Sequence, residues 1–318
     1  MRAETKSPFA HGLYRPLIAL LCSALWGSAA TFIKFGYAAL GVDASDTASQ
    51  LLFAGCRFTL AGILTLLIFS IPEKHFLTPT KPGSWKRIAA LAATQTVVQY
   101  IGFYIGVAHT SGTVCAIFSG CATTLTILAS VYAFRSETMT GSKAVGCLAA
   151  LLAVLLMNYS GLQQGVRFTL LGEGFLLLSL IGNVTSTNLA KRFSAADQPV
   201  MLSGYQFICG GLILSAIGLL SGGRLAFNGR AVLILLWLAM VSAIAYSLWS
   251  LLLKYNDVSR IAVFNSATPI FGLLYSALLL KETEQAFHPL TLLALVLVSG
   301  SIIIINHKAE RSPSRSRG

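Results

Sequence analysis

The chain has 318 residues, of which 55% are hydrophobic and 11% charged, and its formal net charge is +12. Soluble proteins carry about 25% charged residues, so this composition excludes a water-soluble domain of this size. The charges fall in short clusters between apolar runs of roughly 18–23 residues, the length that a helix needs to cross a bilayer. We therefore expect an all-α integral membrane protein whose basic excess lies in loops, with no nucleic acid as partner.

Ten apolar segments are predicted to be transmembrane helices. Their length suits a spanning helix, and they lack the strict alternation of a membrane β-barrel. We take the first of them as a spanning helix, not a cleaved leader, because many similar runs follow it. The segments cover residues 14–38, 49–71, 88–108, 112–134, 144–159, 170–190, 199–221, 231–252, 261–280 and 287–306.

Cysteines do not indicate a disulfide framework or a metal site. All six lie inside apolar runs and lack metal-ligand spacing, so they are expected to be small apolar residues of helix interfaces. No cofactor is expected. The chain also has no zinc-protease HExxH motif, no nucleophile-elbow GxSxG in a strand–helix context and no Walker loop, so we expect no enzyme activity.

Counts of lysine and arginine orient the predicted helices. With the N-terminus inside, 17 of the 23 basic residues fall in inside loops and tails, 5 fall in outside loops, and Arg57 lies within a segment. Basic residues are retained on the cytoplasmic side of a membrane. The count therefore predicts an even number of helices with both termini in the cytoplasm.

The sequence reads as two copies of one five-helix unit. Residues 54–62 (AGCRFTLAG) align with residues 203–211 (SGYQFICGG), which matches Gly55 to Gly204 and Gly62 to Gly211. Five is odd, so the second copy should enter the membrane from the opposite side, as in many transporters. The predicted parts are an N-terminal tail (1–13), a first repeat (14–159), a linker (160–169), a second repeat (170–306) and a disordered basic tail (307–318).

A second internal match carries a family resemblance. Residues 266–284 (SATPIFGLLYSALLLKETE) pair with residues 121–139, so that Glu137 occupies the place of Glu282. Together with LWGSAATFIK at 25–34 and RFTLAG at 57–62, these runs resemble the drug/metabolite transporter superfamily, in its EamA-like ten-helix branch. The resemblance implies carriers of amino acids, related metabolites, sugars, nucleotide sugars or drugs, often outward. It also implies a solute path between the copies, lined by helices 1, 3, 4, 6, 8 and 9.

One departure from the family pattern concerns proline. The family has a proline about 13 residues before the glutamate in both copies, but here only Pro269 is present and Thr124 takes the other position. We therefore expect the two halves to bend differently. Pro269 should free the carbonyl of Asn265 and kink the ninth helix.

Polar and aromatic side chains at helical spacing on the expected path helices are the candidates for binding a solute, because polar groups are costly to bury in hydrocarbon. A competing interpretation is that serine and threonine hydroxyls bond their own helix or join two helices. The candidates are Trp26, Gln95, Gln99, Tyr100, Thr123, Asn183, Thr187, Tyr246, Trp249, Asn265, Thr268 and Tyr275.

Four further residues are assigned structural or gating roles: Arg57, Pro269, Glu137 and Glu282. For Arg57 the alternative is a bond to a substrate carboxylate or phosphate. No acidic residue lies deep in an apolar run, so a buried proton relay is not visible; Glu173 and His109 are the remaining candidates for coupling.

These features together predict a secondary transporter that exports small metabolites such as amino acids by alternating access. The alternatives are an organophosphate or nucleotide-sugar exchanger of the same superfamily, a drug efflux protein, or a membrane scaffold without a solute path. We expect a bacterial inner-membrane location, a small-molecule substrate and a lipid bilayer as surroundings. Whether two copies form a homodimer is left open.

Overall fold

The computed structural model describes residue 9 and residues 14–43, 45–110, 112–157, 159, 163, 169–280 and 289–307. In these ranges every regular element is a helix. The elements are α1 (Tyr14–Leu40), α2 (Thr47–Glu73), α3 (Ser84–Leu91), η1 (Ala92–Val98), α4 (Gln99–Ala108), α5 (Gly112–Tyr132), α6 (Gly141–Met157), η2 (Leu170–Gly174), α8 (Phe175–Phe193), α9 (Pro199–Leu220), α10 (Gly229–Tyr255), α11 (Val258–Ala262), η3 (Val263–Ala267), α12 (Thr268–Leu280) and α14 (Pro289–His307).

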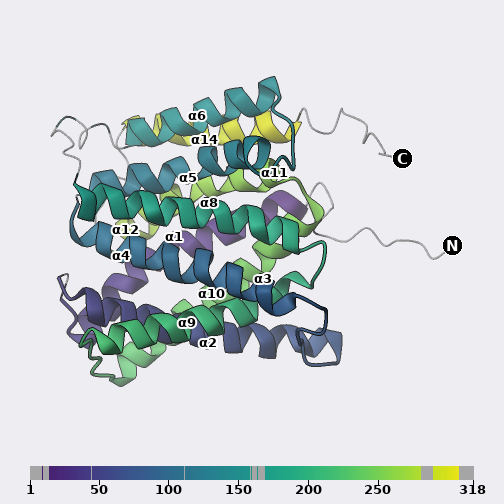
Figure 1. The fold of residues 1–318 in the computed structure, drawn as a ribbon. Helices are drawn as coiled ribbons and strands as arrows, with labels where there is room; N and C mark the ends of the chain where they lie inside the picture. The colour runs from purple at the N-terminus through teal and green to yellow at the C-terminus, as the bar shows by residue number, and fades with distance from the viewer. Residues whose placement is uncertain are drawn as a thin grey trace.

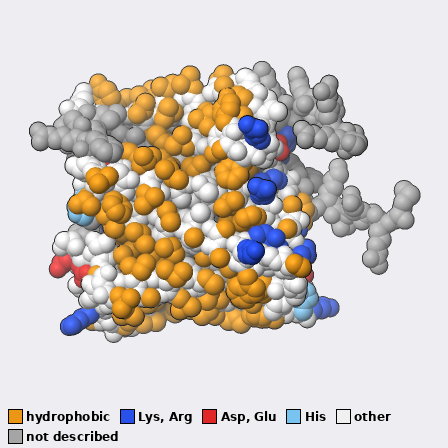
Figure 2. All heavy atoms as spheres, viewed as in Figure 1, with side chains coloured by type: hydrophobic (Ala, Val, Ile, Leu, Met, Phe, Trp, Pro, Cys, Tyr) orange, Lys and Arg blue, Asp and Glu red, His pale blue; other side chains and the backbone are white. Residues whose placement is uncertain are grey.

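Within the described residues these elements form ten rods, because α3–η1–α4, η2–α8 and α11–η3–α12 each run on without a break in the chain. Six rods are long and apolar enough to cross a membrane, and shorter apolar helices stand beside them. The rods lie side by side (Figure 1). Apolar side chains cover much of the visible outer face (Figure 2), and Leu220, for example, is 89% exposed. Such a surface suits lipid and confirms the predicted all-α membrane protein.

Side chains of the flanking loops fix several helix starts. Asp46 accepts from the backbone N–H of Ser49 at 2.9 Å at the start of α2, and Asn228 accepts from that of Ala231 at 2.9 Å at the start of α10. These are N-cap bonds, which satisfy backbone donors that the helix itself cannot pair. The spans thus begin at defined positions.

Glycines bring α2 and α9 together along one edge of the molecule. A Cβ at Gly55 would lie 2.8 Å from the carbonyl oxygen of Gly211, and a Cβ at Gly62 would lie 2.5 Å from that of Gly204. Each glycine therefore contacts the counterpart of the other. Reciprocal contacts between antiparallel, equivalent helices are what a twofold axis produces, and they confirm that the two repeats have inverted topology.

The fifth helices of the two repeats, α6 and α14, pack against each other at the opposite edge (Figure 1). A Cβ at Gly146 would lie 2.4 Å from Cγ1 of Ile305. Both helices are almost purely aliphatic in sequence. They do expose Leu148, Leu152 and Val296, but their other faces form a contact between the repeats.

Most basic residues gather at the end of the bundle where α1 begins and α14 ends, which we call the basic end. Figure 2 shows Lys and Arg concentrated at the right of the view. Lys81, Lys191 and Lys254 lie there, next to the turn that joins α8 to α9 and to the end of α10. Toward the other end of the bundle lie Lys34 near the end of α1, Arg224 in the loop between α9 and α10, and Arg230 at the start of α10.

Candidate functional site

Four predicted residues form one aromatic cluster between the repeats. The ring centroid of Trp26, on α1, lies 5.0 Å from that of Tyr246 and 4.9 Å from that of Trp249, both on α10. The hydroxyl of Tyr246 lies 3.3 Å from that of Tyr100, on α4. We call Trp26, Tyr100, Tyr246 and Trp249 the central aromatic cluster. Edge-to-face contacts of this kind are favourable, so the four residues form one packed group where the repeats meet.

Two phenylalanines on the glycine-packed helices support this cluster. Phe58 of α2 lies 4.4 Å from Tyr100, and Phe207 of α9 lies 4.9 Å from Tyr246, measured between ring centroids. Phe58 and Phe207 are fully buried and stack on each other at 5.2 Å. The two phenylalanines are sequence counterparts in the two repeats. Their stacked pair therefore lies on the twofold axis that relates the repeats.

The ninth rod continues without a chain break, but its α-helical pattern is interrupted by a 3₁₀ segment next to the cluster. Its 3₁₀ segment η3 ends directly before Thr268 and Pro269, and the N–H of Thr268 donates to the carbonyl of Asn265. The expectation that Pro269 leaves this carbonyl free is therefore wrong, because the tighter 3₁₀ turn supplies a donor one residue earlier. The carbonyl of Phe264, in the same 3₁₀ segment, accepts from the hydroxyl of Ser23 on α1 at 2.9 Å.

The equivalent rod of the first repeat has no such break. α5 is one continuous helix, and Thr124, which replaces the proline, donates its hydroxyl to the carbonyl of Cys147 on α6 at 3.2 Å. The two halves differ in shape at this position, as the missing proline predicts.

Close packing of α1 holds the broken rod beside the aromatic cluster. A Cβ at Gly27 would lie 2.6 Å from Cβ of Phe271 and 3.0 Å from the carbonyl oxygen of Thr268. Only a residue without a side chain permits this approach. Trp26, the preceding residue, is thereby placed next to the start of α12.

Three predicted polar residues take part in hydrogen bonds near this break. The hydroxyl of Ser266 donates to that of Thr123 at 3.2 Å, which joins the ninth rod to α5. The hydroxyl of Thr268 donates to the side-chain oxygen of Asn265 at 3.1 Å. In contrast, Thr187 donates to the carbonyl of Asn183 in its own helix at 3.0 Å. These bonds are those of helix packing, and they would have to open before the hydroxyls could contact a solute.

Two buried polar atoms of predicted residues have no hydrogen-bond partner among the described residues. They are Nε1 of Trp26 and Oε1 of Gln99, the residue before Tyr100. One is a donor and the other an acceptor. Buried polar groups are nearly always paired, so these two atoms are open positions, one of them within the central aromatic cluster.

Gln99 also follows an irregular stretch of its rod. Residues 92–98 form the π-helix η1, which contains Gln95, and the backbone of Gln99 packs against Gly182 of α8. Insertions of this kind are frequent at functional sites. Among the described residues, however, neither Gln95 nor Tyr275 makes a hydrogen bond or a ring contact with the central aromatic cluster.

Arg57 is buried under the cluster, 3% exposed. Its Nε and Nη2 donate to the hydroxyl of Ser242 on α10, at 3.2 and 3.0 Å, and its guanidinium lies 5.1 Å from the ring of Phe58. Ser242 lies in the middle of α10, so the bond joins the interiors of two helices. The guanidinium is thus occupied within the protein.

Replacing Ser242 with alanine should destabilise the folded protein by roughly 1.5–3 kcal/mol, because a buried charged donor loses its acceptor. Thermal unfolding of the purified variant in detergent measures this loss. Ser250→Ala on the same helix is the matched control, because Ser250 bonds another hydroxyl, that of Ser203, at 3.0 Å. Equal melting temperatures for the two variants would contradict a special role for the Arg57 contact.

Glu137 links three helices at the basic end. One of its oxygens accepts from the backbone N–H of Ser259 at 3.0 Å, near the start of α11. The other accepts from the Ser259 hydroxyl and from Nζ of Lys143 at 2.7 Å. The contacts are those of a structural residue. Its counterpart Glu282 lies outside the described residues.

Glu173, a candidate for coupling, is held in a cap. It accepts from the hydroxyl of Thr110 and, at 2.7 Å, from the N–H of Thr169, while the hydroxyl of Thr169 accepts from the N–H of Gly172 at 3.1 Å. This reciprocal arrangement is a capping box. His109, the other candidate, contacts the carbonyl of Ile105 through Nδ1 at 2.8 Å, within its own helix.

Sequence reasoning did not single out Ser266 or Asn188. Asn188 is 3% exposed and joins α8 to α5 through the carbonyl of Thr126, at 3.4 Å. The cost of burying an asparagine, which drew attention to Asn183, applies equally to Asn188 and could have found it. Ser266 carries no comparable signal.

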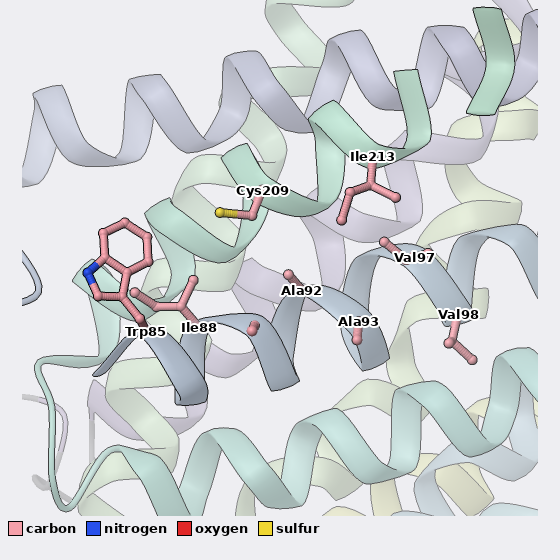
Figure 3. A pocket seen from close by; sticks show the side chains of 9 residues that line it. Trp85, Ile88, Ala92, Ala93, Val97, Val98, Cys209 and Ile213 are labelled. Atoms are coloured by element: carbon pink, nitrogen blue, oxygen red, sulfur yellow. The ribbon is translucent and has the colours of Figure 1, made fainter. Parts of the chain in front are cut away.

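Neither of two pockets lined by described residues includes a predicted site residue. One has a volume of about 240 Å³ and lies between α3–η1 and α9; Trp85, Ile88 and Ala92 face Cys209 and Ile213 across it (Figure 3). Its lining is apolar and offers little to orient a polar solute. The other is polar and lies at the basic end.

Two inverted repeats of membrane-spanning helices, with an aromatic and polar centre between them, define a multi-pass membrane protein of the transporter class. The profile of the EamA-like transporter family matches residues 15–159 and 170–307. The chain belongs to this family, and each repeat matches it separately.

Similar curated proteins are transporters or related to them. Uncharacterized transporter YetK of Bacillus subtilis is 24% identical over 248 residues, which is 74% of this chain and 73% of that protein. A chloroplastic WAT1-related protein of Arabidopsis thaliana is 26% identical over 77% of this chain and 62% of its own length. An uncharacterized transporter of Synechocystis is 32% identical over 49% of this chain and 46% of its own. For the last two, the match covers less than two thirds of the relative.

A solved crystal structure of another protein has the same fold. Its TM-score is 0.71, with 94% of this chain and 98% of that chain covered at 17% identity. The shared fold spans both repeats, so the arrangement of the rods is that of a known structure.

Proposed function

We propose that the protein is a secondary transporter that exports small organic solutes, amino acids first among them, between its two repeats. The supporting observation is a pair of buried polar atoms without a partner, Nε1 of Trp26 within the central aromatic cluster and Oε1 of Gln99, the residue before Tyr100. An α-amino acid carries an acceptor and a donor in one small unit, and could pair with both. Aromatic faces can also hold an ammonium group where no carboxylate is at hand.

Passage of a solute requires the cluster to open. The rings of Trp26, Tyr246 and Trp249 pack directly on one another, and Tyr246 and Trp249 are 8% and 7% exposed. Alternating access would separate α1 and α10 from α4 and α8 on one side of the cluster at a time. Export as the direction, and the basic end as the cytoplasmic face in a bacterial inner membrane, rest on the sequence resemblance and the lysine and arginine count.

An organophosphate exchanger is the second candidate, and the centre of the molecule does not favour it. A phosphate in the path would call for cationic side chains there. Arg57 is a buried cation of the centre, and its described contacts are with Ser242 and the Phe58 ring. Flux assays with both solute classes decide between them.

The test is flux in liposomes that contain the purified protein. Vesicles are loaded with one radiolabelled amino acid at a time, or with a radiolabelled sugar phosphate, and movement is followed in both directions. We expect saturable movement of a subset of amino acids. A folded, monodisperse sample that moves none of them would overturn the proposal, and movement of sugar phosphate alone would support the second candidate.

Replacing Trp26 with phenylalanine separates solute binding from packing. The ring and its contacts are largely kept, but the unpaired N–H is removed, so the stability of the protein should be unchanged or higher. If that N–H binds the solute, KM should rise by roughly tenfold, which corresponds to about 1.4 kcal/mol. Phe35→Leu, on an outer part of α1, is the control. An unchanged KM would contradict a role of the indole N–H.

A further inference from the structure

A polar pocket of about 410 Å³ at the basic end is built by both repeats. Lys81, from the loop between α2 and α3, faces Lys191 at the end of α8 and Lys254 at the end of α10. Asp197 and Gln198, from the turn before α9, complete the polar wall. This volume is in the range of small-molecule sites. We call it the lysine pocket.

None of the three lysines pairs with a carboxylate in the part of the chain that the structure describes. The one acidic lining residue, Asp197, is bonded to Arg87 and accepts from the hydroxyl of Ser84 at 2.7 Å. The next carboxylates have their own partners: Glu137 pairs with Lys143, and Asp257 with Arg260. The pocket therefore carries uncompensated positive charge, which an anion would offset.

Neutral groups of the protein hold the lysines in place. Nζ of Lys191 donates to the carbonyls of Leu253 and Asn256, each at 2.8 Å, and so fixes one positive charge at the end of α10. Nζ of Lys81 donates to the carbonyl of Ala196, and that of Lys254 lies 5.6 Å from the ring centre of Tyr255. An ammonium has three N–H donors, so Lys81 and Lys254 retain donors for a ligand.

The start of α9 adds to the positive field. Gln198 is its N-cap residue and lies on the pocket wall, and the helix runs for 22 residues from Pro199. The N-terminus of a helix carries a partial positive charge. The three lysines and the N-terminus of α9 thus border the same small polar pocket.

We propose that the lysine pocket binds a phosphate group, at a site separate from the central aromatic cluster. A phosphate offers several acceptor oxygens and up to two negative charges, which matches two ammonium groups that retain N–H donors beside a third, fixed charge. The phosphate can belong to a soluble phosphate compound or to the headgroup of an anionic phospholipid. The same side chains would hold either.

Binding of inorganic phosphate to the purified, full-length protein in a neutral detergent tests the site, with isothermal titration as readout. Lys81→Gln and Lys254→Gln should each weaken binding roughly tenfold, because each removes a charge-assisted bond. Lys86→Gln is the matched control: Lys86 is exposed on α3 at the same end and does not line the pocket.

Nanodiscs distinguish the two sources of phosphate. Protein is placed in discs of phosphatidylcholine with or without phosphatidylglycerol, and bound lipid is counted by native mass spectrometry. Lysine-dependent retention of phosphatidylglycerol identifies the headgroup, whereas lysine-dependent phosphate binding that this lipid does not displace identifies a soluble ligand. The proposal is overturned if neither phosphate nor phosphatidylglycerol binds, or if Lys86→Gln loses as much as the pocket variants. Neither readout uses transport, so failure of the phosphate site and failure of the proposed transport function are distinguished.

Discussion

Replacing Gly55 with alanine should destabilise the protein, whereas replacing Gly300 with alanine should not. A Cβ at Gly55 would lie 2.3 Å from Oγ and 2.4 Å from the backbone nitrogen of Ser215 on α9. The backbone cannot give way as a side chain could, so α2 and α9 must separate. Overpacking of this kind costs about 1–3 kcal/mol.

Gly300 is the control because a Cβ there would meet no atom within 4 Å. It also lies inside a helix, α14, where alanine is favoured over glycine by roughly 0.5–1 kcal/mol. The two variants should therefore change stability in opposite directions, measured as the midpoint of thermal unfolding in the same detergent. A Gly55→Ala variant as stable as the wild type would contradict the reciprocal glycine contact between the repeats.

Replacing Trp249 with alanine should reduce solute flux by tenfold or more, and replacing Trp237 should leave it nearly unchanged. Both tryptophans are on α10, but Trp249 is 7% exposed and packs on Trp26, whereas Trp237 is 44% exposed on the outer face. Loss of one aromatic contact to a bound solute is worth on the order of 1.4 kcal/mol, or tenfold.

Folding and transport must be separated for this pair. Removing a buried tryptophan also costs about 3–5 kcal/mol of stability, so flux is expressed per folded, monodisperse protein. Trp249→Phe, which keeps an aromatic ring, should recover part of the flux. If Trp249→Ala folds and transports at the wild-type rate, the central aromatic cluster is packing alone.

The sequence predicted the helices well because their signals are local. Apolar length and the clustering of charge placed every spanning segment, and the odd number of helices per copy predicted the inversion that Gly55 and Gly211 confirm in the contact between α2 and α9. The missing proline at Thr124 also predicted an unbroken α5. All of these depend on neighbouring residues or on comparing one stretch with another.

The site was predictable only in part because its contacts join distant segments. Helical spacing could place Trp26, Tyr246 and Trp249 on path-facing helices, but not bring their rings together. Nothing local shows that Ser23 bonds a carbonyl of the 3₁₀ segment in another rod, or that Lys191 caps α10 from another helix. Such contacts depend on how the rods pack. In the sequence, a serine or threonine that joins two helices cannot be distinguished from one that faces a solute.

The glycine contact between α2 and α9 would act as the pivot for a movement of one repeat against the other. The two helices approach backbone to backbone at Gly55, Gly62, Gly204 and Gly211, so main-chain contacts fix their spacing. Rocking of one repeat against the other would therefore pivot on this edge, and displacement would grow with distance from it. The contact between α6 and α14, at the far edge, would have to travel furthest, and substitutions that stiffen it should slow the rocking without touching any group that binds a solute.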